Sequence, residues 1–270
     1  MAGIITAGFD VGSRFVKACV ARDGRMAGFA VGEIAGDPET SARAILSKAA
    51  EDAGVPVRKI RCVAATGHGS DLVPDTALTF SEAHATTRGL AAIHIPARTV
   101  VDAGGLYLRL YRLNENGGLA RTEENDRCAA GSGKFLEMAA RAVGVSMKDV
   151  SHMAGGEIEG YEIRTNCAVF AESEIISRIN AGHDRSAVLR GVISSIAERT
   201  ATLFTRVPVK PPVILVGGLA RIELFIELLK RASGINLVAC ACDPRSPAAL
   251  GAALLAAENP PPRKKFLGIW

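Results

Sequence analysis

Two segments of the chain share one pattern, and this repeat constrains the fold more than any other feature. "FDVGSRFVKACV", beginning at Phe9, places an acidic residue after a short apolar run, then a glycine turn, then an alternating strand. "VDAGGLYLRLYR", beginning at Val101, repeats each part about 92 residues later. Each copy predicts two strands joined by a tight turn. The repeat predicts two similarly built lobes that face each other across a cleft.

Both predicted turns contain residue types that can bind phosphate. Backbone N–H groups of a glycine turn can point at phosphate oxygens, and a carboxylate can hold hydrated Mg²⁺. Asp10 and Asp102 are therefore the candidate catalytic residues. The further candidate ligand-binding residues here are Gly12, Ser13, Arg14, Lys17, Gly104 and Gly105. Any one of these motifs alone is more simply an ordinary turn after a buried strand.

Two later glycine motifs add to the candidate site. Gly217 and Gly218, followed by Leu219, end the apolar strand "PVILV", and glycine there would let an adenosine lie flat against the backbone. "NDRCAAGSGKFLE" is a small-residue turn that opens a helix, whose first N–H groups are expected to be unpaired and suited to an anion. Its candidate residues are Gly131, Ser132, Gly133 and Lys134.

Composition excludes several classes of protein. With 270 residues, one or two domains are expected. A net charge of +4 and 5% aromatic residues argue against a nucleic-acid-binding protein. The chain lacks an apolar run of the roughly 18 residues that a membrane span needs, which argues against a membrane protein. The start "MAGIITAGFDVGS" has no basic region typical of a signal peptide, so we expect a cytoplasmic protein with reduced thiols.

Four of the six cysteines are expected to be structural. Cys19 and Cys62 lie inside strand-like runs, where a free cysteine is a small buried hydrophobe. Cys240 and Cys242 would point to the same face of a strand, a spacing that could suit a metal ion. We expect instead that Cys240 and Cys242 are core residues beside Val238.

The three glycine motifs, in this order, resemble the ATPase domain shared by actin, Hsp70 chaperones and sugar and acetate kinases. The resemblance covers nearly the whole chain and implies an α/β, duplicated fold with two lobes around a nucleotide cleft. The hairpins would be its phosphate-1 and phosphate-2 elements, and Gly217 and Gly218 its adenosine element. The implied first lobe is residues 1–96, with the phosphate-1 hairpin. The second is residues 97–245, with the phosphate-2 hairpin, Cys128, Cys167 and the adenosine element. Residues 246–270 are a helix and tail expected to pack back on the first lobe.

Two cysteine neighbourhoods, "NDRCAAGSGKFLE" and "TNCAVFAESEII", resemble the paired signatures of one family. It comprises the activators of 2-hydroxyacyl-CoA dehydratases and the ATPase subunits of benzoyl-CoA reductase. This resemblance implies that Cys128 and Cys167, 39 residues apart, are ligands of a [4Fe–4S] cluster shared by two subunits. Thiolate is stabilised at a helix N-terminus, and four thiolates are the usual ligand set. The implied cofactors are the cluster, ATP or ADP, and Mg²⁺. The implied partners are a second ATPase subunit, a ferredoxin that donates electrons, and iron–sulfur reductase subunits that bind a CoA ester.

The second phosphate element departs from the activators. They usually carry "DIGGQD", whereas this chain has Leu106 and Tyr107 in place of the Gln and Asp. In the activators, the Gln amide would position a water molecule for hydrolysis of the γ-phosphate. Because this chain lacks that amide, the resemblance does not decide whether this subunit hydrolyses ATP. The change is more similar to the smaller ATPase subunit of benzoyl-CoA reductase, which pairs with a different ATPase subunit. We therefore expect the low-potential electron-transfer subunit of a dearomatising reductase. The alternatives are a homodimeric dehydratase activator, a small-molecule kinase, and a nucleotide-binding structural subunit.

Overall fold

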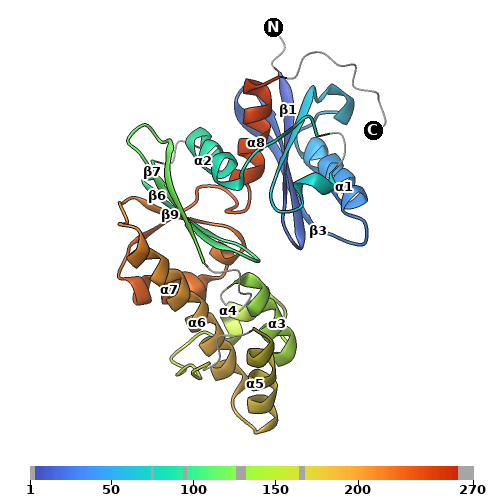
Figure 1. Cartoon of the computed structure of the whole chain (residues 1–270). Helices are drawn as coiled ribbons and strands as arrows, with labels where there is room; N and C mark the ends of the chain where they lie inside the picture. The colour runs from blue at the N-terminus through green and yellow to red at the C-terminus, as the bar shows by residue number, and fades with distance from the viewer. Residues whose placement is uncertain (1–3, 74–75, 94–95, 126–131, 164–167, 261–270) are drawn as a thin grey trace. The chain divides into compact units, whose positions relative to one another are not determined.

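The computed structural model describes residues 4–73, 76–93, 96–125, 132–163 and 168–260 (Figure 1). Their contacts divide them into two compact units. The first contains the described residues up to Pro96, Asn116–Leu119, and those from Ala241 onward. The second contains Ala97–Glu115 and the described residues from Ala120 to Cys240. In the part of the chain described, no helix is long and apolar enough to cross a membrane.

Each unit is built on a five-stranded sheet, and the two sheets have the same topology. The orders are β3-β2-β1-β4-β5 and β10-β9-β6-β7-β8, so each central strand has a hairpin partner on one side and a parallel strand on the other. The first sheet consists of β1 (Ile5–Val11), β2 (Phe15–Arg22), β3 (Arg25–Glu33), β4 (Cys62–Thr66) and β5 (Leu78–Thr79). The second consists of β6 (Thr99–Ala103), β7 (Leu108–Leu113), β8 (Leu119–Glu124), β9 (Val213–Val216) and β10 (Leu237–Ala239). The predicted duplication is confirmed.

Helices cover both faces of the first sheet. They are α1 (Pro38–Asp52), α2 (Glu82–Ala92) and α8 (Pro247–Glu258), and α8 lies beside β1 in Figure 1. Alternate strand residues face opposite sides, so Ala18 and Val20 pack with α1 while Cys19 and Ala21 pack with α8. The helix α8 lies so close to the sheet that a Cβ on Gly8 would lie 2.2 Å from the carbonyl oxygen of Ala249. This close fit holds β1 and its hairpin against α8.

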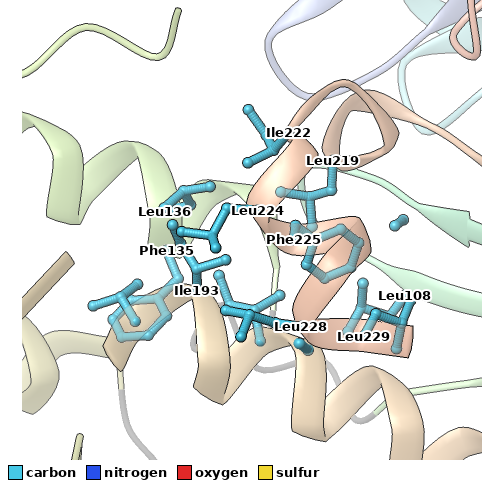
Figure 2. Packing of buried hydrophobic residues seen from close by; sticks show 14 of the residues in the cluster. Leu108, Phe135, Leu136, Ile193, Leu219, Ile222, Leu224, Phe225, Leu228 and Leu229 are labelled. Atoms are coloured by element: carbon cyan, nitrogen blue, oxygen red, sulfur yellow. The ribbon is translucent and has the colours of Figure 1, made fainter. Parts of the chain in front are cut away.

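The second unit packs its helices into one apolar core beside the sheet. Its helices are α3 (Gly133–Val143), α4 (Val150–Met153), α5 (Ala168–Asn180), α6 (Arg185–Arg206) and α7 (Glu223–Ser233). Figure 2 shows Leu108 of β7 in the same core as Phe135 of α3, Ile193 of α6 and Phe225 of α7. Leu219 of the 3₁₀ turn η4 (Gly218–Arg221) also lies there. The second hairpin, the start of α3 and the late glycine turn are thus anchored in one core.

Candidate functional site

The first hairpin places a carboxylate and an ammonium beside its glycine turn. The strand register pairs Asp10 with Lys17, which puts both side chains on one face of the sheet. Lys17 Nζ lies 2.9 Å from Asp10 Oδ2, and the two side chains are 16% and 14% exposed. The N–H of Gly12 donates to the carbonyl of Phe15 across 3.0 Å and closes the turn. The Asp10 carboxylate suits hydrated Mg²⁺, which prefers oxygen ligands.

The two residues after Gly12 have different surroundings. Ser13 is exposed at the tip of the turn. Arg14 forms an ion pair with Glu33 of β3, with 2.9 Å between the guanidinium Nη2 and Oε1. The same guanidinium lies 5.4 Å from the centroid of the Phe15 ring. Arg14 therefore links the turn to the neighbouring strand.

The second hairpin repeats this backbone geometry. The N–H of Gly104 donates to the carbonyl of Tyr107 across 2.9 Å, at the position that corresponds to the Gly12 bond. The register pairs Asp102 with Arg109, as it pairs Asp10 with Lys17. Gly105 is exposed at the tip. The two copies of the motif are therefore alike in strand pairing and turn closure.

The side chains around the second carboxylate differ from those around the first. The hydroxyl of Tyr111 donates to Asp102 Oδ2 across 3.2 Å. Arg109 lies with its guanidinium 4.3 Å from the centroid of the Tyr107 ring, and its Nε lies 3.2 Å from Glu124 Oε2. Sequence reasoning assigned no role to Tyr111, because an alternating strand does not reveal which polar side chain reaches a carboxylate on the neighbouring strand.

A glycine follows the parallel strand in both units, and one of the two was not predicted as a site residue. Gly67 follows β4 and Gly217 follows β9, and both have φ of +95°. A Cβ on Gly217 would lie 2.5 Å from the carbonyl oxygen of Ala103, and one on Gly67 would lie 2.4 Å from that of Val11. Each glycine is therefore needed where its turn touches the residue after the hairpin aspartate. By contrast, a Cβ on Gly218 would meet nothing within 4 Å.

The first N–H groups of α3 are not available to an anion, which corrects the sequence-based expectation. Gly133 N–H donates to the carbonyl of Gly104 across 3.0 Å, and Lys134 N–H donates to that of Gly105 across 2.8 Å. Ser132, the residue before the helix, is fully buried. A Cβ on Gly133 would lie 3.0 Å from the Gly104 oxygen, so glycine permits this contact. The start of α3 is fastened to the second hairpin.

Asn125, which precedes Cys128, is also hydrogen-bonded to the second hairpin. The N–H of Asn125 donates to the carbonyl of Leu108 across 3.0 Å. The Leu108 N–H donates in return to Asn125 Oδ1 across 2.9 Å. Leu108 is the first residue of β7, directly after the glycine turn. Asn125 and Gly133, on either side of Cys128, are therefore both bonded to the second hairpin; residues 126–131 lie outside the described residues.

This combination of a repeated phosphate-type hairpin, a late glycine turn and a cysteine motif can be compared with known families. Residues 7–256 match the model of the BadF/BadG/BcrA/BcrD ATPase family. The chain belongs to this ATPase family.

Some relatives of this ATPase are named for enzymes that act on CoA esters. The activator of lactoyl-CoA dehydratase from Anaerotignum propionicum is 32% identical, with 94% of this chain and 97% of the relative covered. A benzoyl-CoA reductase subunit from Thauera aromatica is 31% identical, with 93% and 92% covered. The activator of 2-hydroxyisocaproyl-CoA dehydratase from Clostridium difficile, solved with ADPNP, has a TM-score of 0.87 at 29% identity, with 95% of each chain covered. The predicted fold class and family are confirmed.

The predicted cluster ligands of this ATPase, Cys128 and Cys167, lie outside the described residues, as does Gly131. The helices that follow them are described. α3 begins at Gly133 and α5 begins at Ala168, and the two helices pack against each other in the core of the second unit. Among the described residues, no group of three or more His, Cys, Asp or Glu side chains could hold a metal ion.

The other cysteines of the ATPase divide into two pairs. Cys19 and Cys62 are buried, as predicted, and burial raises the pKa of both thiols, so neither is a thiolate. Cys240 and Cys242 are only half-buried and follow the end of β10, while Val238 is 41% exposed. The expectation of core positions beside Val238 is wrong, because β10 ends at Ala239 and the chain leaves the sheet there.

Proposed function

We propose that this protein is an ATP-dependent electron-transfer ATPase for a partner enzyme that acts on a CoA ester. Cys128 and Cys167 would supply half of the ligands of one [4Fe–4S] cluster, and a second ATPase subunit would supply the other half. Two observations support the proposal: both kinds of relative are named for CoA-ester systems, and both cysteines precede helices that pack together. When bound, such a cluster stores one electron at low potential.

ATP and Mg²⁺ would be bound by the elements already described. Asp10 and Asp102 would hold hydrated Mg²⁺, and Lys17 and the N–H groups of the exposed turn tips would face phosphate oxygens. The turn at Gly217 and Gly218 would lie against the adenosine. Bound Mg²⁺ neutralises negative charge on the phosphates.

The observation that carries the proposal is the double attachment of the Cys128 segment. Asn125 at its start is bonded to Leu108, and Gly133 and Lys134 at its end are bonded to Gly104 and Gly105. A change in the second hairpin on nucleotide binding or hydrolysis would therefore move both attachment points of a cluster ligand. Packed helices and backbone hydrogen bonds change between a few distinct arrangements and do not deform gradually, so a small shift at the hairpin can be passed on to the cysteine. ATP binding and hydrolysis would in this way be coupled to the iron–sulfur cluster, without phosphoryl transfer to a substrate.

The two candidate partner enzymes, a reductase and a dehydratase, differ in the ATPase subunits that they require. The residue types at Leu106 and Tyr107 are the sequence feature that favours a benzoyl-CoA reductase type of heterodimer. Three relatives that are 30–32% identical are named as dehydratase activators, so the homodimeric activator is a candidate of equal weight. Self-association of the purified chain without another ATPase subunit would favour the activator, whereas dependence on a second, different subunit would favour the reductase.

The test is the iron content and electron paramagnetic resonance spectrum of anaerobically purified protein. We expect about two irons per chain, because a four-iron cluster would be shared by two subunits. The Cys128→Ala, Cys167→Ala variant should lose the iron and the reduced-cluster signal. The control is Cys240→Ala, Cys242→Ala, which removes two half-buried thiols outside the proposed ligand set and should keep both the iron and the signal. Iron absent even after candidate ATPase subunits are added would contradict the proposal and favour a small-molecule kinase.

A separate prediction tests the coupling through Asn125. Asn125→Ala removes the acceptor of the Leu108 N–H and leaves that donor unpaired, so the Cys128 segment is held less firmly at its start. We expect the variant to keep its iron. The rate of iron capture by an Fe²⁺ chelator, compared with and without MgATP, should lose most of the nucleotide dependence of the wild type. Asn114→Ala, beyond the end of β7, is the control. An unchanged nucleotide dependence would exclude Asn125 from the coupling.

A further inference from the structure

Tyr111 is a buried polar side chain that the proposed function does not yet use. It is fully buried on β7, directly after Leu110, which lies in the apolar core of the second unit. Successive strand residues point to opposite sides, so Tyr111 faces the side of the sheet away from that core. Its hydroxyl donates to Asp102 Oδ2 across 3.2 Å. A buried tyrosine hydroxyl needs a hydrogen-bond partner, and here the partner is the candidate catalytic carboxylate.

The protonation state makes this bond directional. Burial raises the pKa of Tyr111 well above its usual value, and the nearby Asp102 raises it further, while Arg109 opposes this in part. The phenol is therefore neutral at any pH at which the protein works, and it donates to the carboxylate. A hydrogen bond to a charged acceptor stabilises the charged form and is stronger than one between neutral groups.

The comparison between the two hairpins shows that this bond is particular to the second. Asp10 is held by an ammonium, because Lys17 lies opposite it in the register. Asp102 has Arg109 opposite it, but that guanidinium also stacks on Tyr107 and bonds to Glu124. Asp102 thus has a buried, neutral donor among its partners, in addition to the guanidinium opposite it.

We propose that Tyr111 is a positioning residue for the second phosphate element. Its hydroxyl holds Oδ2 of Asp102 and so sets the orientation in which the carboxylate faces the hydrated Mg²⁺ of a bound nucleotide. This rests on the nucleotide binding in the proposed function, and does not depend on the iron–sulfur cluster. The bond with a fully buried hydroxyl fixes which oxygen of Asp102 faces the interior, while the residue as a whole stays partly exposed.

The test compares Tyr111→Phe with wild type in the full chain. The substitution removes one oxygen and keeps the ring, so the packing is preserved. We measure the Mg²⁺ concentration needed for half-maximal binding of a fluorescent, non-hydrolysable ATP analogue, together with the melting temperature. The Mg²⁺ requirement should rise about tenfold, the order expected for one charge-assisted bond. Binding of the analogue without Mg²⁺ should stay the same, because a positioning role through Asp102 concerns the metal. Tyr161→Phe, in the same unit, is the control and should change neither.

A double-mutant cycle with Asp102→Asn separates positioning from a general structural effect. If Tyr111 acts through Asp102, adding Tyr111→Phe to Asp102→Asn should not raise the Mg²⁺ requirement further. Additive effects, or an unchanged requirement in folded Tyr111→Phe, would overturn the inference. Wild-type protein that binds the Mg²⁺–analogue complex but holds no iron would refute the electron-transfer proposal and leave this inference standing. Wild-type protein that does not bind the analogue would refute both.

Discussion

Replacing Asp10 by Asn is expected to lower the turnover of ATP hydrolysis about a hundredfold or more. The substitution keeps the shape of the side chain and removes the negative charge that would hold hydrated Mg²⁺ on the phosphates. It also leaves the ammonium of Lys17, 2.9 Å from Asp10 Oδ2 and only 16% exposed, without its partner. Because the pair is partly solvated, we expect a loss of stability of about 1–3 kcal/mol. Phosphate release and thermal unfolding measure the two effects separately.

The double variant Asp10→Asn, Lys17→Gln distinguishes lost chemistry from lost folding. It removes both charges, so no unpaired ammonium stays in the hairpin and much of the stability should return. Hydrolysis should stay at or below the level of the single variant, because the metal-binding charge is still absent and the ammonium that would face the phosphates is removed as well. Recovery of turnover together with stability would show that Asp10 acts only in the ion pair. If Asp10→Asn hydrolysed ATP at the wild-type rate, Asp10 would not be part of the nucleotide site.

The elements that the sequence predicted well are those with strong local signals. The segment "PETSARAILSKAAEDAG", residues 38–54, has the pattern of an amphipathic helix that ends at a glycine, and it forms α1. The Asp37 carboxylate caps this helix by accepting from the Thr40 N–H, and the chain turns at Gly54 with φ of +62°. The two strand–turn–strand repeats were also predictable, because acidic and glycine residues interrupt clear apolar runs. Strands β3 and β8 were missed. β3 contains two glycines, and β8 is almost entirely exposed and charged at its end, so neither shows a clean alternation.

The candidate site was less predictable than the fold, for a specific reason. The sequence pointed to the acidic and glycine residues of each turn, since these are recognisable from type and order. It did not show that Gly133 and Lys134 use their N–H groups on the second hairpin, or that Asn125 fixes the other end of the cysteine segment. These bonds join residues far enough apart in the chain that only the packing of α3 brings them together. The "TG" that ends the first parallel strand was the available signal for Gly67, by analogy with Gly217.

Alanine at Gly217 is expected to be far more damaging to the fold than alanine at its neighbour Gly218. Gly217 has φ of +95°, where a side chain is strained, and its Cβ would lie 2.5 Å from the carbonyl oxygen of Ala103. We expect a loss of about 3 kcal/mol or more, because both backbone strain and a backbone collision must be relieved. Ala103 follows Asp102, so relief by movement of β6 would also weaken nucleotide binding. Thermal unfolding and binding of the fluorescent ATP analogue are the measurements.

Gly218→Ala serves as the matched comparison and tests the adenosine assignment itself. Its Cβ would meet nothing within 4 Å, so the fold should keep its stability. If the nucleotide lies against this turn, the added methyl group occupies space that the adenosine needs, and analogue affinity should fall about tenfold or more while the melting temperature stays unchanged. Full affinity in a stable Gly218→Ala would place the adenosine elsewhere. Gly217 would then be needed only for the close contact between η4 and the end of β6, as Gly67 is for the contact between β4 and β1.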